Sequence, residues 1–226
     1  MDERELHRDK LAKACRFLYR EGILDAYGHL SARVPGTGRL LINPKEIPSG
    51  EVRPESLVEV SPDGRSLSPD LNPPAEVIIH SAVYRARPDV GAVAHFHPPF
   101  ATAFATTGKR IVLVYIAAAI FHRGVPFFED PQLIVFPEQA ERMAQALGSC
   151  RALMLRNHGA VVVGRSIEEM VGGSVILEEN AKRLHLAWSL GQPQALTPQE
   201  IEEALTKYRI EERAIGRVWT LCNAVP

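Results

Sequence analysis

Two histidines separated by one residue carry the clearest chemical signal in this 226-residue chain, at His95-Phe96-His97. The apolar run from Val90 to His97 predicts a buried strand, and side chains two apart on a strand point to the same side. The strand therefore sets two imidazoles next to each other. Such a pair suits a divalent metal ion, and it equally suits two hydrogen-bonded histidines inside a core.

A third histidine lies in a turn that has no conformational need for it. Asn157-His158-Gly159 separates apolar runs at residues 152–155 and 160–163, as a hairpin turn does. A tight turn uses asparagine and glycine for their backbone conformations, whereas histidine offers no such advantage. His158 is therefore a candidate third ligand, with an ordinary surface position in the turn as the alternative.

A carboxylate precedes another apolar run. Glu76 is followed by Val-Ile-Ile in an expected helix, where an unpaired buried carboxylate would be costly. Beside a metal it would serve as fourth ligand or as general acid/base. The alternative is a carboxylate favoured only by the helix dipole. His80 lies one turn later, where it could hydrogen-bond to Glu76 or be an ordinary core histidine.

Two further places are candidates for contacts with a substrate. Residues 27–33, Tyr-Gly-His-Leu-Ser-Ala-Arg, concentrate glycine and polar donors after a helix, as a binding loop does. This segment makes His29 and Ser31 candidates. Lys45 follows an expected strand and could bind an anionic group, with a solvated surface lysine as the alternative.

Interleaved helices and strands must position these groups. Helices are predicted at about 3–21, from Asn72 to before Pro88, at 137–148, at 166–190 and from Thr197 onward as the last helix. Strands are predicted at 40–42, 57–60, 90–97, 152–155 and 160–163, with one or two more in 111–121. This order predicts an α/β protein with helices on both faces of a central sheet. Because no repeat or linker interrupts it, we expect one domain over residues 1–226.

Charge and composition exclude several kinds of partner. With 26 basic and 27 acidic residues and a formal net charge of -1, the chain has no general positive field for nucleic acid or an anionic membrane. Its longest apolar run, 111–121, is too short to span a bilayer. The N-terminus is charged where a signal peptide would be apolar, and three separated cysteines suit a reducing compartment. We therefore expect a cytoplasmic protein.

Taken together, the motifs resemble those of the class II aldolase/adducin-head family over nearly the whole chain. The nineteen-residue spacing from the family's catalytic glutamate to its first metal-binding histidine is kept from Glu76 to His95. The corresponding segments are Gly28-His-Leu-Ser-Ala-Arg33, Pro74-Ala-Glu76, His95-Phe-His97 and Asn157-His-Gly159.

The resemblance implies a fold, a cofactor and an assembly. The fold would be a three-layer α/β/α sandwich around a mixed, largely antiparallel sheet. One divalent ion per subunit, zinc or manganese, would be held by His95, His97 and His158, and Glu76 would be the acid/base or an exchangeable fourth ligand. The family's aldolases are cyclic tetramers with the site at a subunit interface, so a homotetramer is implied.

Departures from the family's sugar-phosphate aldolases narrow the substrate. Those enzymes hold phosphate with a loop asparagine, a Ser/Thr-Gly pair and two serines before the glutamate. This chain has His29, Lys45-Glu46 and Pro74-Ala75 there. A dianionic phosphate needs several converging donors, whereas proline and alanine offer none and Glu46 would repel it. We therefore expect a small, anionic, non-phosphorylated substrate.

The same comparison weakens an aldol reaction. An ungapped count places Ile116, with Tyr115 adjacent, where the aldolases have a catalytic tyrosine. Whether Tyr115 or a C-terminal residue of a neighbouring subunit completes the site stays open.

Three functions remain. The Gly-His-x-Ser-x-Arg and Pro-Ala-Glu segments are more similar to the family's decarboxylase-like branch. We therefore expect a metal-dependent carbon–carbon lyase, a decarboxylase of a small hydroxy-carboxylate that can be aromatic, with His29 and Lys45 as candidates for a second carboxylate. One alternative is an aldolase acting on a non-phosphorylated aldehyde or 2-oxo acid. The other is a non-catalytic interaction module like the adducin head, against which the retained histidines and glutamate argue.

Overall fold

Residues 3–224 are described in the computed structural model, and within them seven strands form one sheet in the order β3-β2-β1-β4-β7-β6-β5. The strands are β1 His29–Arg33, β2 Leu40–Ile42, β3 Val58–Val60, β4 Ala92–Phe96, β5 Phe127–Phe128, β6 Ala152–Leu155 and β7 Ala160–Gly164. Only the β5–β6 pair is parallel among these described strands. The predicted mixed, largely antiparallel sheet is confirmed.

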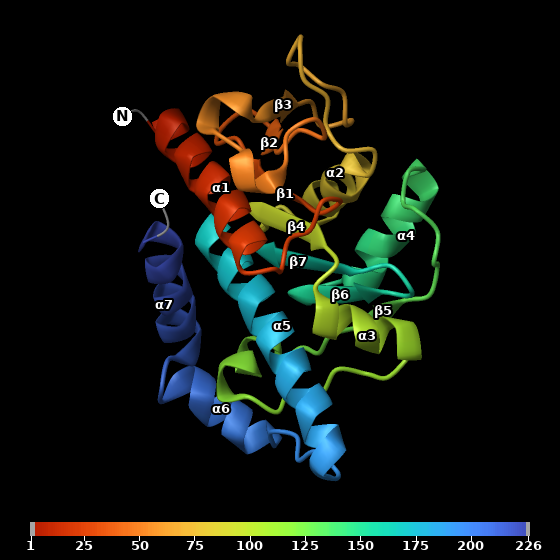
Figure 1. Cartoon of the computed structure of the whole chain (residues 1–226), viewed down its shortest axis with the longest axis vertical. Helices are drawn as coiled ribbons and strands as arrows, with labels where there is room; N and C mark the ends of the chain where they lie inside the picture. The colour runs from red at the N-terminus through yellow and green to blue at the C-terminus, as the bar shows by residue number, and fades with distance from the viewer. Residues whose placement is uncertain (1–2, 225–226) are drawn as a thin grey trace.

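Helices cover both faces of the sheet. They are α1 Glu3–Arg20, α2 Val77–Ala86, α3 Pro99–Thr107, α4 Pro137–Leu147, α5 Ile167–Leu190, α6 Pro198–Thr206 and α7 Ile210–Ala224, with 3₁₀ turns η1 Ser49–Glu51, η2 Pro54–Ser56 and η3 Ile116–Phe121. In Figure 1, α1, α5 and α7 lie on one side of the sheet, and α2 and α4 lie together on the other. The α/β/α layering implied by the resemblance is confirmed.

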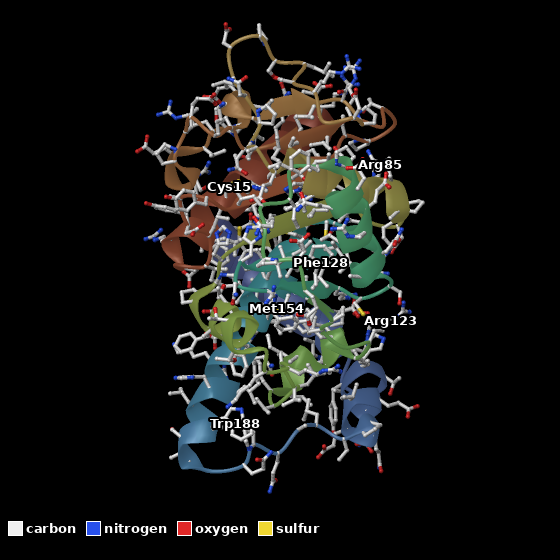
Figure 2. All side chains as sticks on the ribbon, turned by 90° about the vertical axis from the view of Figure 1, so that its right-hand side faces the viewer. Cys15, Arg85, Arg123, Phe128, Met154 and Trp188 are labelled. Carbon is white, nitrogen blue, oxygen red and sulfur yellow. The ribbon has the colours of Figure 1, made fainter. Side chains whose placement is uncertain are left out.

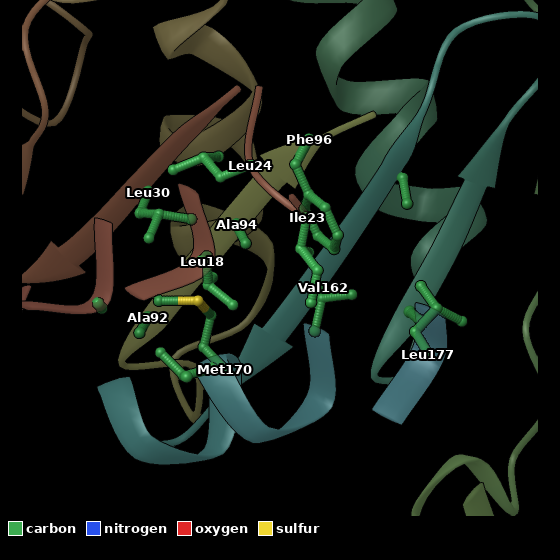
Figure 3. Packing of buried hydrophobic residues seen from close by; sticks show 14 of the residues in the cluster. Leu18, Ile23, Leu24, Leu30, Ala92, Ala94, Phe96, Val162, Met170 and Leu177 are labelled. Carbon is green, nitrogen blue, oxygen red and sulfur yellow. The ribbon is translucent and has the colours of Figure 1, made fainter. Parts of the chain in front are cut away.

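Alternation along β4 divides its side chains between the two layers. Ala94 and Phe96 face the core under α1 and α5, whereas Val93 belongs to the core under α2 and α4. Figure 3 shows Phe96 packed in the core under α1 and α5, together with Val162 of β7 and Met170 of α5. Because side chains alternate on a strand, a fully buried Phe96 turns its odd-numbered neighbours towards the α2 layer.

Helix α2 starts later than the sequence predicts. The sequence predicts a helix from Asn72, whose side chain could cap it, but the Asn72 side-chain amide donates to Glu46 at 2.8 Å and the helix begins at Val77. Two consecutive prolines, Pro73 and Pro74, explain the difference, since a residue before proline is pushed out of the helical region. Glu76 is consequently the N-cap residue of α2 rather than a member of its first turn.

Residues 111–121 do not form the predicted strand or strands. Instead the backbone of this segment bonds to the side chain of Asn180 in α5, which donates to the Val112 carbonyl at 2.9 Å and accepts from the Val114 N–H at 3.0 Å. The segment then turns into η3, whose residues 117–121 are buried. The apolar run correctly indicated burial, but a side-chain amide replaces the expected sheet partner.

The other helices and strands lie closer to their predicted bounds, apart from the following differences. The expected binding loop at 27–33 contains strand β1, and α3 and β5 were not predicted. The last predicted helix is two helices, α6 and α7, separated by Arg209 with φ 47°. By contrast, α1 ends at Arg20, close to the predicted residue 21, and Gly22 with φ 68° lies just beyond it. Ser166 and Thr197 cap α5 and α6 through their side chains.

The three cysteines are free thiols. Figure 2 shows Cys15 far from Trp188, which lies near the end of α5. Burial raises the pKa of the Cys15 thiol to about 12, so this cysteine behaves as a small core residue. None of the helices within residues 3–224 is long and apolar enough to cross a bilayer.

Candidate metal centre

Strand pairing gathers the predicted ligands at one end of β4. His95 lies opposite His29 of β1, and Phe96 lies opposite Ala160 of β7. The turn before β7 holds His158 next to the same strand end, with Asn157 in the left-handed conformation at φ 53°. The topology therefore brings together residues from three segments that are far apart in the sequence.

The three predicted ligand histidines form a tight cluster. Ring centroids are 5.0 Å apart for His95 and His97, 4.8 Å for His95 and His158, and 5.4 Å for His97 and His158. One nitrogen from each ring lies within 4.8 Å of the other two. Within residues 3–224, His95 Nε2 and both His158 nitrogens are buried without a hydrogen-bond partner. Such orphaned imidazole nitrogens fit a divalent ion, because coordination would satisfy them.

Neighbouring groups orient two of these rings. His95 Nδ1 lies 3.2 Å from the Ala160 carbonyl oxygen, and His97 Nδ1 lies 3.0 and 3.1 Å from the two carboxylate oxygens of Asp25. An N–H donated from Nδ1 leaves the Nε2 lone pair free for an ion, the arrangement commonly found behind metal-bound histidines. Burial acts to raise the pKa of Asp25, but its hydrogen bond and charge interaction with His97 hold that pKa below its usual value.

Sequence reasoning missed Asp25. Besides His97, its carboxylate accepts the backbone N–H groups of Tyr27 and Gly28 at 3.1 and 2.9 Å. An acidic residue two positions before Tyr27 was the available signal, since aspartate favours such local turns. Asn43 was missed as well. It is buried at the cavity wall, where its side-chain oxygen accepts the Leu30 N–H at 2.7 Å.

Glu76 points one carboxylate oxygen at the cluster. Its Oε1 accepts the Ile134 N–H at 2.8 Å, and its Oε2 lies 3.6 Å from His95 Nε2 and 3.5 Å from His158 Nε2. Burial acts to raise the pKa of Glu76, but these two histidines and the Ile134 N–H together lower it. The ionised carboxylate is therefore placed either to ligate an ion or to exchange a proton with a bound molecule.

A cavity of about 850 Å³ opens over this cluster. Four of the predicted site residues besides His158 line it, namely His29, Lys45, Glu76 and His97. Ser31 does not line it: the Ser31 hydroxyl is fully buried behind His29 and bonds to His80 and Tyr84. Ser31 therefore does not contact the cavity itself, unlike the other two predicted substrate-binding residues, His29 and Lys45. His80 bonds to His29 and Ser31 rather than to Glu76.

Gly159 is required by the close approach of two segments. A Cβ at this position would lie 2.4 Å from the Phe96 carbonyl oxygen and 2.7 Å from His97 Cδ2. Glycine therefore lets the His158 turn approach the end of β4 closely. This explains the His-Gly pair in the turn more directly than a hairpin preference does.

Fold and site together define an α/β/α protein with three histidines and one carboxylate arranged as in divalent-metal sites. Residues 9–185 match the class II aldolase and adducin N-terminal domain family, and the chain belongs to that family. Class II aldolases use a divalent metal, and the described residues hold a corresponding ligand set.

Relatives include both aldolases and decarboxylases. The chain is 28% identical over 207 residues to the 5-methylthioribulose-1-phosphate/5-deoxyribulose-1-phosphate aldolase of Rhodospirillum rubrum, covering 86% of this chain and 92% of that protein. It is 31% identical over 186 residues to the 3,4-dihydroxyphthalate decarboxylase of Rhodococcus jostii, covering 76% of each. The L-fuculose 1-phosphate aldolase structure from Glaciozyma antarctica PI12 shares the fold, with a TM-score of 0.83, 24% identity and coverage of 98% of this chain and 92% of that one.

Replacing Asp25 by asparagine tests the orienting contact behind His97. The amide keeps the size of the side chain but lacks the charge that holds the His97 N–H, so divalent metal affinity should fall by about 10- to 100-fold. Competition with a fluorescent chelator measures this affinity. Asp63→Asn, which changes an exposed carboxylate paired with Arg65, is the control and should bind metal as the unaltered protein does. Equal affinities would show that Asp25 has no such role.

Proposed function

We propose that this protein is a divalent-metal-dependent carbon–carbon lyase, and specifically a decarboxylase of a small non-phosphorylated hydroxy-carboxylate. The observation that carries the proposal is the cavity itself. At one place it joins a three-histidine cluster, the carboxylate of Glu76 and two groups suited to an anion, His29 and Lys45.

The cavity wall argues against a phosphate. Pro74 and Ala75 line it and have no side-chain donors, and Glu46, whose carboxylate accepts two hydrogen bonds from Asn72, lines the same cavity. Hydrogen bonds from Asn72 lower the pKa of Glu46, so this group carries a negative charge at neutral pH. One lysine beside a carboxylate suits a substrate carboxylate better than a phosphate dianion, which needs several donors.

In this proposal each side chain has a stated task. A divalent ion held by His95, His97 and His158 would polarise the substrate oxygen and stabilise developing negative charge. For a hydroxyl on the unsaturated carbon next to the one that bears the carboxylate, Glu76 takes the hydroxyl proton as a general base and gives it to the carboxylate-bearing carbon, so that the oxygen becomes a carbonyl. When the bond to the carboxylate breaks, carbon dioxide leaves, the bond's electron pair restores the carbon–carbon double bond, and the carbonyl oxygen becomes an anion. Water supplies the proton that this oxygen regains. Lys45 and His29 hold a second carboxylate.

The relatives support the class of reaction, but they act on different kinds of substrate. The Rhodococcus jostii relative is a decarboxylase of a non-phosphorylated aromatic dicarboxylate, whereas the Rhodospirillum rubrum relative is an aldolase of phosphorylated sugars. Pro74, Ala75 and Glu46 at the cavity favour the first kind of substrate for this chain.

A substrate panel tests the proposal. Metal-reconstituted protein is incubated with hydroxylated benzene and pyridine dicarboxylates, non-phosphorylated 2-oxo acids and sugar phosphates, and products are identified by mass spectrometry. Release of carbon dioxide from a hydroxy-dicarboxylate is expected. Aldehyde products alone would favour an aldolase, and turnover of sugar phosphates alone would overturn the proposed substrate class.

The aldolase remains the second candidate because its chemistry also leaves an electron pair beside a polarised oxygen. Tyr115, the nearest match to the aldolase tyrosine, is half-buried against α5 with the Arg183 guanidinium 4.2 Å from its ring centre. It does not line the cavity in the described part of its own chain. An aldolase would need this group from a neighbouring subunit.

An interaction module without catalysis is the third candidate. It would have no use for the orphaned histidine nitrogens in the cluster. Elemental analysis separates the two classes: about one equivalent of zinc or manganese per chain is expected after reconstitution. A content below about a tenth of an equivalent would favour the module.

We also infer that copies of this chain associate, as a tetramer by resemblance, and that the single domain of residues 1–226 acts in the cytoplasm. Tyr27, Leu133 and Phe136 are 78%, 62% and 62% exposed, and the first two line the cavity mouth. Exposed apolar side chains beside a site suit a subunit contact. Sedimentation should give a mass several times 25.0 kDa; a concentration-independent monomer would contradict this inference.

A further inference from the structure

A buried chain of polar side chains runs from the cavity into the α2 layer. It joins alternate residues of β1, His29 and Ser31, with residues one helical turn apart on α2, His80 and Tyr84. Side chains two apart on a strand share a face, as do side chains four apart on a helix. The two periodicities therefore place these four groups in one line under the cavity.

The contacts along this line are short. His29 Nδ1 lies 2.6 Å from His80 Nε2, His80 Nδ1 lies 2.6 Å from the Ser31 hydroxyl, and that hydroxyl lies 2.9 Å from the Tyr84 hydroxyl. His29 lines the cavity, and Nε2 is the ring nitrogen that its contact with His80 leaves free. The line therefore has one end at the cavity and the other at Tyr84.

All four groups are buried, with His29 and His80 only 1% and 0% exposed, and burial favours their uncharged forms. It lowers the pKa of His80 to about 3. Burial also raises the pKa of Tyr84 above its usual value. Each group consequently carries a single polar hydrogen, because a neutral imidazole has one N–H and a hydroxyl has one O–H.

Three arrangements of these hydrogens satisfy all three contacts. In the first, Tyr84 donates to Ser31, Ser31 donates to His80 Nδ1, and His80 Nε2–H donates to His29, which then presents Nε2–H to the cavity. In the other two, His29 donates to His80 and His80 donates to Ser31, so His29 presents a bare Nε2. The Ser31 hydroxyl then either donates to Tyr84 or accepts from both neighbours. The tautomer of His80 thus determines what His29 offers to a ligand.

The hydrogen-bond geometry favours the first arrangement, because it alone gives each buried hydroxyl hydrogen an acceptor along the line. In the other two, the hydroxyl hydrogen of Tyr84 or that of Ser31 is left over, and no further acceptor for these buried hydroxyls is found among residues 3–224. A buried donor without an acceptor is costly.

We propose that Ser31 and His80 hold His29 as a neutral hydrogen-bond donor whose Nε2–H binds a carboxylate or enolate oxygen of the substrate. His80 and Ser31 are positioning residues in this scheme. The substrate class rests on the function proposed above, whereas the arrangement of hydrogens does not. A single neutral donor suits a carboxylate oxygen, and it is a poor match for a phosphate dianion.

Nitrogen NMR of the Zn²⁺-loaded protein reads the arrangement directly. With ¹⁵N-labelled histidine, His29 and His80 should each show a protonated Nε2 and an unprotonated Nδ1, assigned by comparing the unaltered protein with His29→Gln and His80→Gln. A bare His29 Nε2 would overturn the proposal. Ser31→Ala removes the donor to His80 and should shift both rings, whereas Tyr84→Phe breaks the chain one link further away and should leave both tautomers unchanged. Unshifted rings in Ser31→Ala would show that the line is not coupled.

Binding of a small hydroxy-dicarboxylate tests the consequence. Calorimetry with tartronate should give a dissociation constant about 10-fold higher in His80→Leu, which cannot donate to His29. Tyr84→Phe should stay within about 3-fold of the unaltered protein, and metal content should be equal in all three. An unchanged dissociation constant in His80→Leu, or no tartronate binding by the unaltered protein, would refute the binding role.

These measurements separate the inference from the function on which it partly rests. The tautomers and the tartronate affinity do not depend on turnover. If both have the expected values but no compound of the substrate panel is converted, only the lyase function is refuted. Carbon dioxide release together with a bare His29 Nε2 would refute only the inference.

Discussion

Replacing His97 by alanine should abolish metal binding and turnover together. The side chain supplies one of three clustered nitrogens, and its ring lies 5.0 and 5.4 Å from those of His95 and His158. Two imidazoles and a carboxylate hold a divalent ion much more weakly than three imidazoles do. The substitution also leaves the Asp25 carboxylate without the N–H of His97, which adds uncompensated charge near the site.

Metal content after dialysis and carbon dioxide release from the best substrate measure the two losses. We expect less than about a tenth of an equivalent of metal and activity near the detection limit, since an open catalytic site depends on its protein ligands. His185→Ala is the matched control because His185 is exposed and contacts Phe100, 5.6 Å away between ring centres. Retention of both metal and activity in His97→Ala would eliminate the three-histidine site.

Replacing Glu76 by glutamine should lower turnover by about two to four orders of magnitude while the metal stays bound, because an amide cannot take up and return a proton at neutral pH. The amide oxygen can still accept the Ile134 N–H, which Glu76 Oε1 now accepts at 2.8 Å. Local structure should therefore persist. The three histidines remain, so metal content should be close to that of the unaltered protein.

The matched control for this substitution is a second buried glutamate. Glu178 of α5 accepts the backbone N–H groups of Phe100 and Ala101 at 2.8 and 2.9 Å, outside the histidine cluster. Glu178→Gln tests the general effect of removing a buried carboxylate and should leave turnover per folded molecule unchanged. Loss of metal from Glu76→Gln, with activity restored by added ion, would make Glu76 a ligand and assign the proton transfer elsewhere. If Glu76→Gln keeps both its full activity and its full metal content, Glu76 has only the role of a carboxylate favoured by the helix dipole.

The sheet and its helices were largely predictable because they depend on local periodicity. Alternation and apolar composition predicted β4, β6 and β7, and capping residues Ser166 and Thr197 predicted the starts of α5 and α6. Residues 111–121 were mispredicted, because composition indicates burial without naming the hydrogen-bond partner. That partner is Asn180, more than sixty residues away in the sequence.

The four clustered site residues could also be found from the sequence. His95 and His97 follow from strand spacing, His158 from a turn with no need for histidine, and Glu76 from a carboxylate opening an apolar run. The family to which the chain belongs is consistent with these motifs. Their roles in catalysis remain predictions for the substitutions described above.

What the sequence by itself determined was the set of chemical groups and the elements that carry them, because residue type and short-range spacing are local properties. Only the tertiary structure decided which groups meet. Asp25 orients His97 across 72 residues, and His80 turns from Glu76, its neighbour on the helix, to His29 and Ser31 on β1. These contacts depend on the strand order and on the packing of α2 against the sheet, so a one-dimensional pattern does not contain them.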